Sequence, residues 1–264
     1  MSKYLQVIRI KITDAFYHRA RAFIWVLNDF IVPVSMIAVT SHFYVNRVTL
    51  GGYTQSNLLA YYMLAGLFSA FMPTDVDNEI SNEISTGDLS GYLLKPLSYI
   101  KYQLASFFGW KIFKLILYLP FFIAFTALFN INLVNIATIN QLAVLLLLIG
   151  ISFTVTYLLS YTFGLVSFWV TEIGGIKTLR EVLVLLLGGQ VIPVTFMPDW
   201  INHINQFLPF RYILVFPIDF IQGKLTQANL LNGLLIETIW IIVFFLTIKY
   251  LWCKGIVEYS AVGN

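Results

Sequence analysis

Charged side chains are scarce in this chain of 264 residues: Asp, Glu, Lys and Arg together make up 11%, whereas hydrophobic residues make up 59%. An average soluble domain is about 25% charged and about 45–50% apolar. One soluble core of this size could not bury so much apolar surface, and apolar runs of about 18 or more residues recur along the chain. The composition therefore excludes a soluble globular protein and predicts an all-α integral membrane protein.

Residues that commonly build catalytic or metal sites are also few. Cys253 is the single cysteine, so the chain forms no disulfide within itself. The three histidines, His18, His42 and His203, are far apart, and no HExxH spacing occurs. A phosphate-cradling GxxxxGK(S/T) loop is missing as well. We therefore expect no enzyme, metal site or cofactor in this chain, and a net charge of +3 is too small to indicate nucleic-acid binding.

Hydropathy predicts six membrane spans. They cover about residues 24–44, 58–72, 115–129 and 142–170, a fifth that starts near Val182, and about residues 230–248. The second is short for a bilayer, so we expect it to begin upstream, near Tyr53. The fourth is longer than a bilayer requires, which predicts a tilt or a projection beyond the lipid.

Basic residues are distributed unequally between the two sides of these spans. All of the 16 Lys and Arg residues except Arg47, Arg211 and Lys224 fall on the side that carries both termini. The positive-inside rule therefore predicts cytoplasmic termini. The first apolar run is too long for the core of a signal peptide, so we expect no cleavable leader.

Residues 1–22 carry the pattern of a basic amphipathic helix. Tyr4, Ile8, Ile12 and Ala15 fall near one helical face, and the basic residues lie elsewhere. Such a helix lies along the inner membrane surface. Packing on the protein itself is the alternative.

The fifth span is interrupted by Gly188–Gly189 and by Pro193. Beyond it, Asp199 can cap a short helix, and residues 212–221 are apolar but contain Pro217 and are too short to cross a bilayer. We therefore interpret residues 198–221 as two external re-entrant helices, which must be covered by protein or by a watery cavity.

A polar insert, residues 74–98, separates the second and third spans. Thr74 and Asp77 have the spacing of a capping box, Gly87 is placed to end a helix, and Pro96 stops a second one. The insert is predicted to be a short helix, a turn and a stub that returns to the membrane. Its Ile, Leu and Tyr side chains favour docking to a cytoplasmic partner; packing on its own bundle alone is the alternative.

Ionisable groups within the spans are few, and Asp29 and Glu237 are costly in lipid. Asp29 is near enough to the interface for a structural partner such as Arg21 or a neighbouring subunit, and Glu237 could form a buried hydrogen bond. The hydroxyl row of the fourth span either lines a path or packs helices. Our candidates for a transport path or gate are Asp29, Thr154, Ser160, Pro193, Pro198 and Glu237.

Two stretches carry a family resemblance. The insert reads EISTGDLSGYLLKPLS, and the segment after the fifth span reads IPVTFMPDWI, followed by LPFRYILVFPIDFIQG. Together with the amphipathic N-terminus and six spans, they resemble the permease subunits of bacterial type 2 ATP-binding-cassette exporters over essentially the whole chain. The resemblance implies one permease domain, residues 1–264, in the bacterial cytoplasmic membrane.

The resemblance also implies partners. The insert would be a coupling helix seated in an ABC ATPase subunit that carries ATP and Mg, residues 1–22 a connecting helix, and residues 198–221 the external closure. A second permease subunit, identical or related, would complete the path within the membrane lipid. The implied ATPase contacts are Asn78, Glu79, Glu83, Asp88, Leu89, Tyr92, Lys95 and Pro96.

The function that this resemblance implies is ATP-driven export of a lipid-like, amphiphilic or drug-like substrate. An ion-gradient-driven carrier or an intramembrane enzyme is the alternative. Two intramembrane carboxylates without a clear inverted repeat are weak support for a carrier, and no nucleophile–base pair supports an enzyme.

Overall fold

The computed structural model describes residues 3–44, 49–131, 133, 138–170 and 173–259. Every regular element in this part of the chain is helical. Arg47, which we assigned to the outer side, lies outside the described residues. The elements are α1 (Lys3–Tyr17), α2 (Arg19–Phe43), α3 (Gln55–Phe71), α4 (Val76–Ser85), α5 (Leu89–Leu93), α6 (Tyr99–Leu128), α7 (Ile139–Leu165), the 3-10 turn η1 (Val166–Phe168), α8 (Gly174–Leu187), the 3-10 turn η2 (Val194–Phe196), α9 (Asp199–Asn205), α10 (Phe210–Ile213), α11 (Val215–Ile221) and α12 (Gln227–Glu258).

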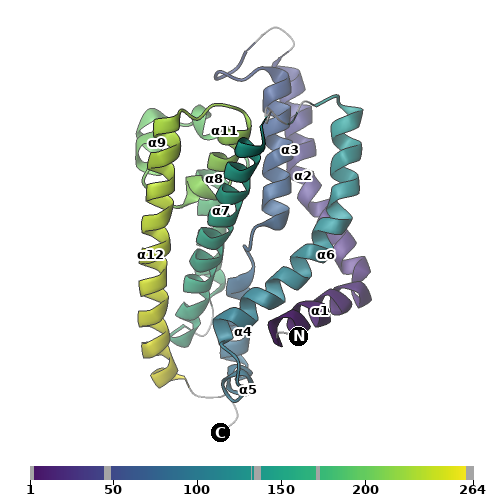
Figure 1. Ribbon diagram of the computed structural model, residues 1–264. Coiled ribbons are helices and arrows are strands. Elements are labelled where there is room, and N and C mark those ends of the chain that lie inside the picture. The colour runs from purple at the N-terminus through teal and green to yellow at the C-terminus, as the bar shows by residue number, and fades with distance from the viewer. Residues whose placement is uncertain (1–2, 45–48, 132, 134–137, 171–172, 260–264) are drawn as a thin grey trace.

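Three helices in the described residues are long and apolar enough to cross a membrane: α6, α7 with η1, and α12. The all-helical architecture and these three apolar helices are consistent with an integral membrane protein, whereas six spans were expected from hydropathy. In Figure 1, α12, α7, α3 and α2 run side by side. The N-terminal helix α1 and the insert helices α4 and α5 lie at one end of this bundle, and α9 and α11 lie at the other. We call the end with α1 and α5 the basic end.

Helix α6 corrects the boundary of the third span, because it begins at Tyr99 rather than near Leu115. Lys111 and Lys114 made the preceding stretch look too polar for a span. Both are buried with partners: the Lys111 ammonium donates to the carbonyl of Ala70 (3.1 Å), and Lys114 Nζ lies 2.7 Å from Asp29 Oδ2. The first half of α6 runs obliquely across α1, and the second half turns upright beside α2 (Figure 1).

Helix α8 corrects the fifth span, which was expected over Val182–Met197. The helix begins at Gly174 and ends at Leu187, and Gly189 then adopts a left-handed φ of 74°. Without a Cβ, glycine takes this conformation at little cost, so the pair Gly188–Gly189 breaks the helix. The region after it folds into three short helices, α9 to α11, rather than two.

Helix α4 corrects the capping box. It begins at Val76 with Asp75 at the cap position, and no side chain caps it. Thr74 lies too early for this role, and Asp77 faces the protein interior. The expected break at Gly87 is confirmed, because its φ of 84° is left-handed and α4 ends just before it.

The insert belongs to the bundle core. Ile80, Ile84 and Leu89 are buried and share the main hydrophobic cluster with α3 and α7. Gly164 on α7 permits this close packing, because a Cβ there would lie 2.9 Å from the Ile80 Cβ and 3.1 Å from the Asp77 Cα. The insert is therefore packed on the membrane bundle along one face.

The N-terminal helix packs on α6. A Cβ on Gly109 of α6 would lie 2.7 Å from the Ile8 carbonyl oxygen, and Ala15 is fully buried near Phe113. Away from this contact, Leu5 and Ile10 of α1 remain exposed. One face therefore packs on protein, as in our alternative, while apolar side chains remain available to lipid or a partner.

We predict that Gly164→Leu lowers the free energy of unfolding by about 1–3 kcal/mol or more, because the new side chain overpacks the α4–α7 contact. Gly150→Leu on the same helix is the control, since nothing lies within 4 Å of a Cβ there. Denaturant titration in detergent micelles measures both. Equal stability of the two variants would contradict the packing of the insert.

Candidate functional site

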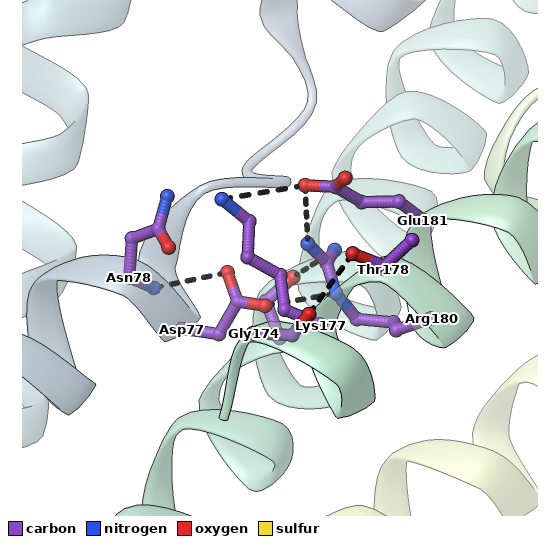
Figure 2. A network of polar contacts seen from close by, with 8 residues as sticks. Asp77, Asn78, Gly174, Lys177, Thr178, Arg180 and Glu181 are labelled. Atoms are coloured by element: carbon purple, nitrogen blue, oxygen red, sulfur yellow. Dashed lines mark hydrogen bonds and ion pairs between the residues drawn. The ribbon is translucent and has the colours of Figure 1, made fainter. Parts of the chain in front are cut away.

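A buried ion pair joins the insert to α8. Arg180 Nε lies 3.0 Å from Asp77 Oδ2, and the two side chains are 1% and 0% exposed. Arg180 Nη1 also donates to Ser160 Oγ on α7 (3.2 Å). Figure 2 shows the Asp77 and Arg180 side chains meeting between their two helices, with Glu181 and Lys177 at the edge. One guanidinium therefore connects α4, α7 and α8.

The electrostatics of this pair are costly. Burial raises the pKa of Asp77 to about 6, although Arg180, Lys177 and the backbone N–H of Asn78 (3.1 Å) oppose the rise. Desolvation of a buried pair often exceeds its Coulombic gain, yet removal of one partner leaves an uncompensated charge. The pair is thus a strong constraint on geometry rather than a large net source of stability.

A polar hollow of about 420 Å³ opens between α2, α3, α6 and α8. Along α8 its lining changes from Thr178, Arg180 and Glu181 to Val184 and Leu185. Along α8 a charged part of the lining thus continues into an apolar part. The other charged lining residues are Asp29, Asp75, Lys111 and Lys114.

The broken end of α8 is held by polar side chains of other helices. The hydroxyl of Tyr61 donates to the Gly189 carbonyl (2.6 Å), and that of Tyr62 donates to the Val191 carbonyl (3.2 Å). Asn205 Nδ2 donates to the Leu187 carbonyl (2.8 Å). Non-helical backbone within a membrane protein is tolerated only where such partners cover it. The segment after α8 is therefore anchored to α3 and α9.

The structure distributes the eight candidate ATPase contacts between surface and interior. Glu79, Asp88, Lys95 and Pro96 are exposed, and Asn78 and Tyr92 are partly buried. Asp88 does not cap α5 but accepts a hydrogen bond from Thr86 Oγ1 (2.8 Å).

Two of the eight residues point inward. Leu89 is fully buried in the main core, so its assignment as a surface contact is corrected: its apolar side chain packs inside, whereas Leu94 is 88% exposed. Glu83 accepts hydrogen bonds from the Tyr99 hydroxyl and from Gln103 Nε2 (2.6 Å for the latter). It therefore links the insert to α6.

The gate candidates fall into different environments. Asp29 lies in the polar hollow and pairs with Lys114 rather than Arg21. Ser160 binds Arg180 at its border. Thr154 donates to the Gly150 carbonyl of its own helix (2.8 Å). The structure thus places Asp29 in the hollow and connects Ser160 to it only through Arg180, while neither Ser160 nor Thr154 lines it.

The remaining gate candidates lie elsewhere. Glu237 on α12 is fully buried, and Ser152 Oγ lies 3.3 Å from its Oε1 and 2.7 Å from the Tyr212 carbonyl oxygen. Pro193 is buried and Pro198 is exposed, on either side of η2. These three residues are not part of the polar hollow.

Sequence reasoning missed the residues that organise the site. Asp77 was assigned to a helix cap, and Arg180 was used only to count charges. Tyr61 and Tyr62 were absorbed into a span, although two adjacent tyrosines in an apolar run are a detectable signal of polar partners. A partner distant in the chain could not be identified from either residue alone.

The bundle defines an integral membrane protein, and the described residues contain no cluster that could hold a metal ion. A family model described as "ABC-2 family transporter protein" matches residues 30–263. The chain belongs to this family. Membership indicates a membrane subunit of an ABC transporter rather than a catalytic enzyme, and it implies ABC ATPase subunits as partners. A search of curated proteins finds no match.

We predict that Asp77→Asn lowers the free energy of unfolding by about 3–5 kcal/mol, because Arg180 cannot lose its proton and keeps only the longer, half-exposed contact to Glu181 (3.7 Å) as an ion pair. Arg180→Met should cost less, since an unpaired Asp77 can become protonated. In the double variant the losses should not add. Denaturant titration measures this cycle.

The exposed neighbours provide the control for this cycle. Lys177→Gln removes the partly exposed pair with Glu181 at 3.5 Å, which contributes only about 0–1 kcal/mol, and it leaves the contact between Glu181 and Arg180 in place. Additive losses at Asp77 and Arg180 would show that the buried pair is not an energetic unit.

Tyr61→Phe should destabilise the protein by about 1–3 kcal/mol, because the buried Gly189 carbonyl loses its hydrogen-bond donor. Tyr250→Phe is the control, since this tyrosine is exposed on α12. Thermal unfolding followed by intrinsic fluorescence compares the two. A Tyr61→Phe variant as stable as the control would mean that the anchor is not required.

Proposed function

We propose that this chain is the membrane-spanning half of an ATP-driven exporter for a lipid-like, amphiphilic or drug-like substrate. ATP and Mg are bound by the partner ATPase, which contacts the insert, residues 74–98, on the cytoplasmic side. A second permease subunit, identical or related, completes the path. The membership of the chain in the ABC-2 family supports this arrangement.

The ion pair between Asp77 and Arg180 is the observation that carries the proposal. Energy from a partner can enter a transporter only through a surface that the partner touches. Here α4 packs against α7 through Gly164, and its Asp77 grips α8. A push on the insert therefore moves α8, which forms a wall of the polar hollow.

The exposed side of the insert supplies the proposed ATPase contact. Glu79, Asp88, Lys95 and Pro96 are exposed there, and Leu94 adds an apolar side chain beside them. Glu83 and Leu89 face the bundle instead. Glu83 binds Gln103 of α6, and Leu89 packs in the main hydrophobic cluster. A stiff insert with a mixed polar and apolar surface suits the transmission of force.

The polar hollow is the proposed entrance for the substrate. Three basic and three acidic side chains line its described surface, so an uncharged or zwitterionic polar group fits better than a strongly charged one. The apolar wall that follows along α8 suits the rest of an amphiphile. The anchored segment after α8, with residues 198–221, is the proposed outer closure.

A carrier driven by an ion gradient is the competing function, and the fully buried Glu237 is the observation that favours it. In a carrier, Glu237→Gln would abolish substrate movement that needs no ATP. In the proposed exporter, movement requires ATP hydrolysis by the partner, whatever residue 237 is.

We predict that Glu79→Arg with Asp88→Arg lowers substrate-coupled ATPase activity at least about tenfold in the reconstituted complex, because reversed charges weaken a complementary interface. The control is Asp199→Arg, which reverses a charge at an exposed position on α9, at the opposite end of the bundle (Figure 1). If the insert variant kept its substrate-coupled ATPase activity, the proposed contact between the insert and the ATPase would be wrong.

A further inference from the structure

A second hollow, of about 400 Å³, lies between the start of α6 and the C-terminal half of α12. We call it the aromatic groove. It shares no lining residue with the polar hollow. Its main lining residues are Tyr92, Leu97, Tyr99, Phe245, Lys249 and Trp252.

Aromatic rings form a bridge across this groove. Tyr99 of α6 stacks on Trp252 of α12, with ring centroids 5.4 Å apart. The hydroxyl of Tyr99 donates to Glu83, which fixes the orientation of the ring. Tyrosine and tryptophan concentrate at membrane–water interfaces, where one edge of the ring is apolar and the other is wet. The groove thus has the composition of the headgroup boundary.

Lys249 is the only charged residue that lines the groove among the residues described. The Glu83 carboxylate lies behind this lining, where it accepts the hydrogen bond of the Tyr99 hydroxyl. Nearby, Lys95 Nζ lies 4.6 Å from the centroid of the Tyr92 ring. Both lysines are exposed, and neither makes an ion pair in the described part of the chain. Two cations without counterions therefore lie at an aromatic rim.

The apolar surface of α12 continues the groove towards the middle of the bundle. Ile242, Phe245 and Leu246 are each more than half exposed. At the other end, α12 is tied to the insert, since the backbone N–H of Ser90 donates to the Tyr259 hydroxyl (3.2 Å). The groove is thus open along an apolar helix face and bounded at the basic end.

We propose that the aromatic groove binds one anionic phospholipid of the leaflet at the basic end. An acyl chain lies along Phe245 and Ile248, and the phosphate is held by Lys249 and Lys95. This lipid is a resident of the groove rather than cargo, because the groove is separate from the polar hollow. The proposal does not depend on the direction or the energy source of transport.

Cys253 provides a site-specific reporter, since it is the single cysteine, is exposed and lines the groove. The full chain is reconstituted in nanodiscs of phosphatidylcholine alone or with phosphatidylglycerol. The rate of Cys253 alkylation by N-ethylmaleimide is then measured. We expect phosphatidylglycerol to slow alkylation severalfold by occupying the groove. Lys249→Gln with Lys95→Gln should raise the phosphatidylglycerol concentration needed for half-maximal protection about 25-fold, because each basic residue contributes a factor of about five in affinity.

Arg19→Gln with Arg21→Gln is the matched control, because it removes the same charge from exposed positions at the basic end but outside the groove. Protection should survive in this control. Equal alkylation in both lipids would overturn the proposal. Protection that persists in the lysine variant would also overturn it, because the negative surface potential alone would then explain the slower reaction. ATP-dependent movement of phosphatidylglycerol to the other leaflet by the complete complex would make the lipid cargo and overturn its resident role.

Discussion

The burial of Arg180 against Asp77 is the constraint on which the rest of the arrangement depends. A guanidinium cannot shed its proton, so it must find an anion wherever the fold places it. In this protein the anion comes from the insert, and Ser160 of α7 supplies a further partner. The insert is therefore locked to the helices that line the polar hollow, and it cannot move independently of them without exposing a charge in a dry interior.

Helix α8 is held at two places. Arg180 anchors its middle to Asp77, and the hydroxyls of Tyr61 and Tyr62 hold the backbone that follows it. Because α8 is too short to cross a bilayer alone, these side-chain partners replace the lost helical hydrogen bonds. The same helix thus carries the contact to the insert and leads into the segment that is anchored to α3 and α9.

Most of the other buried charges also work between helices. Lys114 pairs with Asp29 to join α6 to α2, and Lys111 donates to the carbonyl of Ala70 near the end of α3. These contacts let α6 run as one long helix through a stretch that hydropathy alone assigned to a loop. Glu237 differs, because its described partner is a serine hydroxyl. The bundle thus uses intramembrane charge mainly to set the positions of its helices.

The sequence by itself determined that the chain is an apolar helical membrane protein, and it placed the insert, its break at Gly87 and the interruption at Gly188–Gly189. Those features depend on local properties: hydropathy over a window, the backbone freedom of glycine and the restrictions of proline. Only the tertiary structure decided which side chains meet. Asp77 and Arg180 are a hundred residues apart, and Leu89 and Leu94 look alike in sequence. Leu89 is buried and Leu94 is exposed because only one face of the insert packs on the bundle. Close packing of Ile80 against Gly164 of α7 determines which face that is.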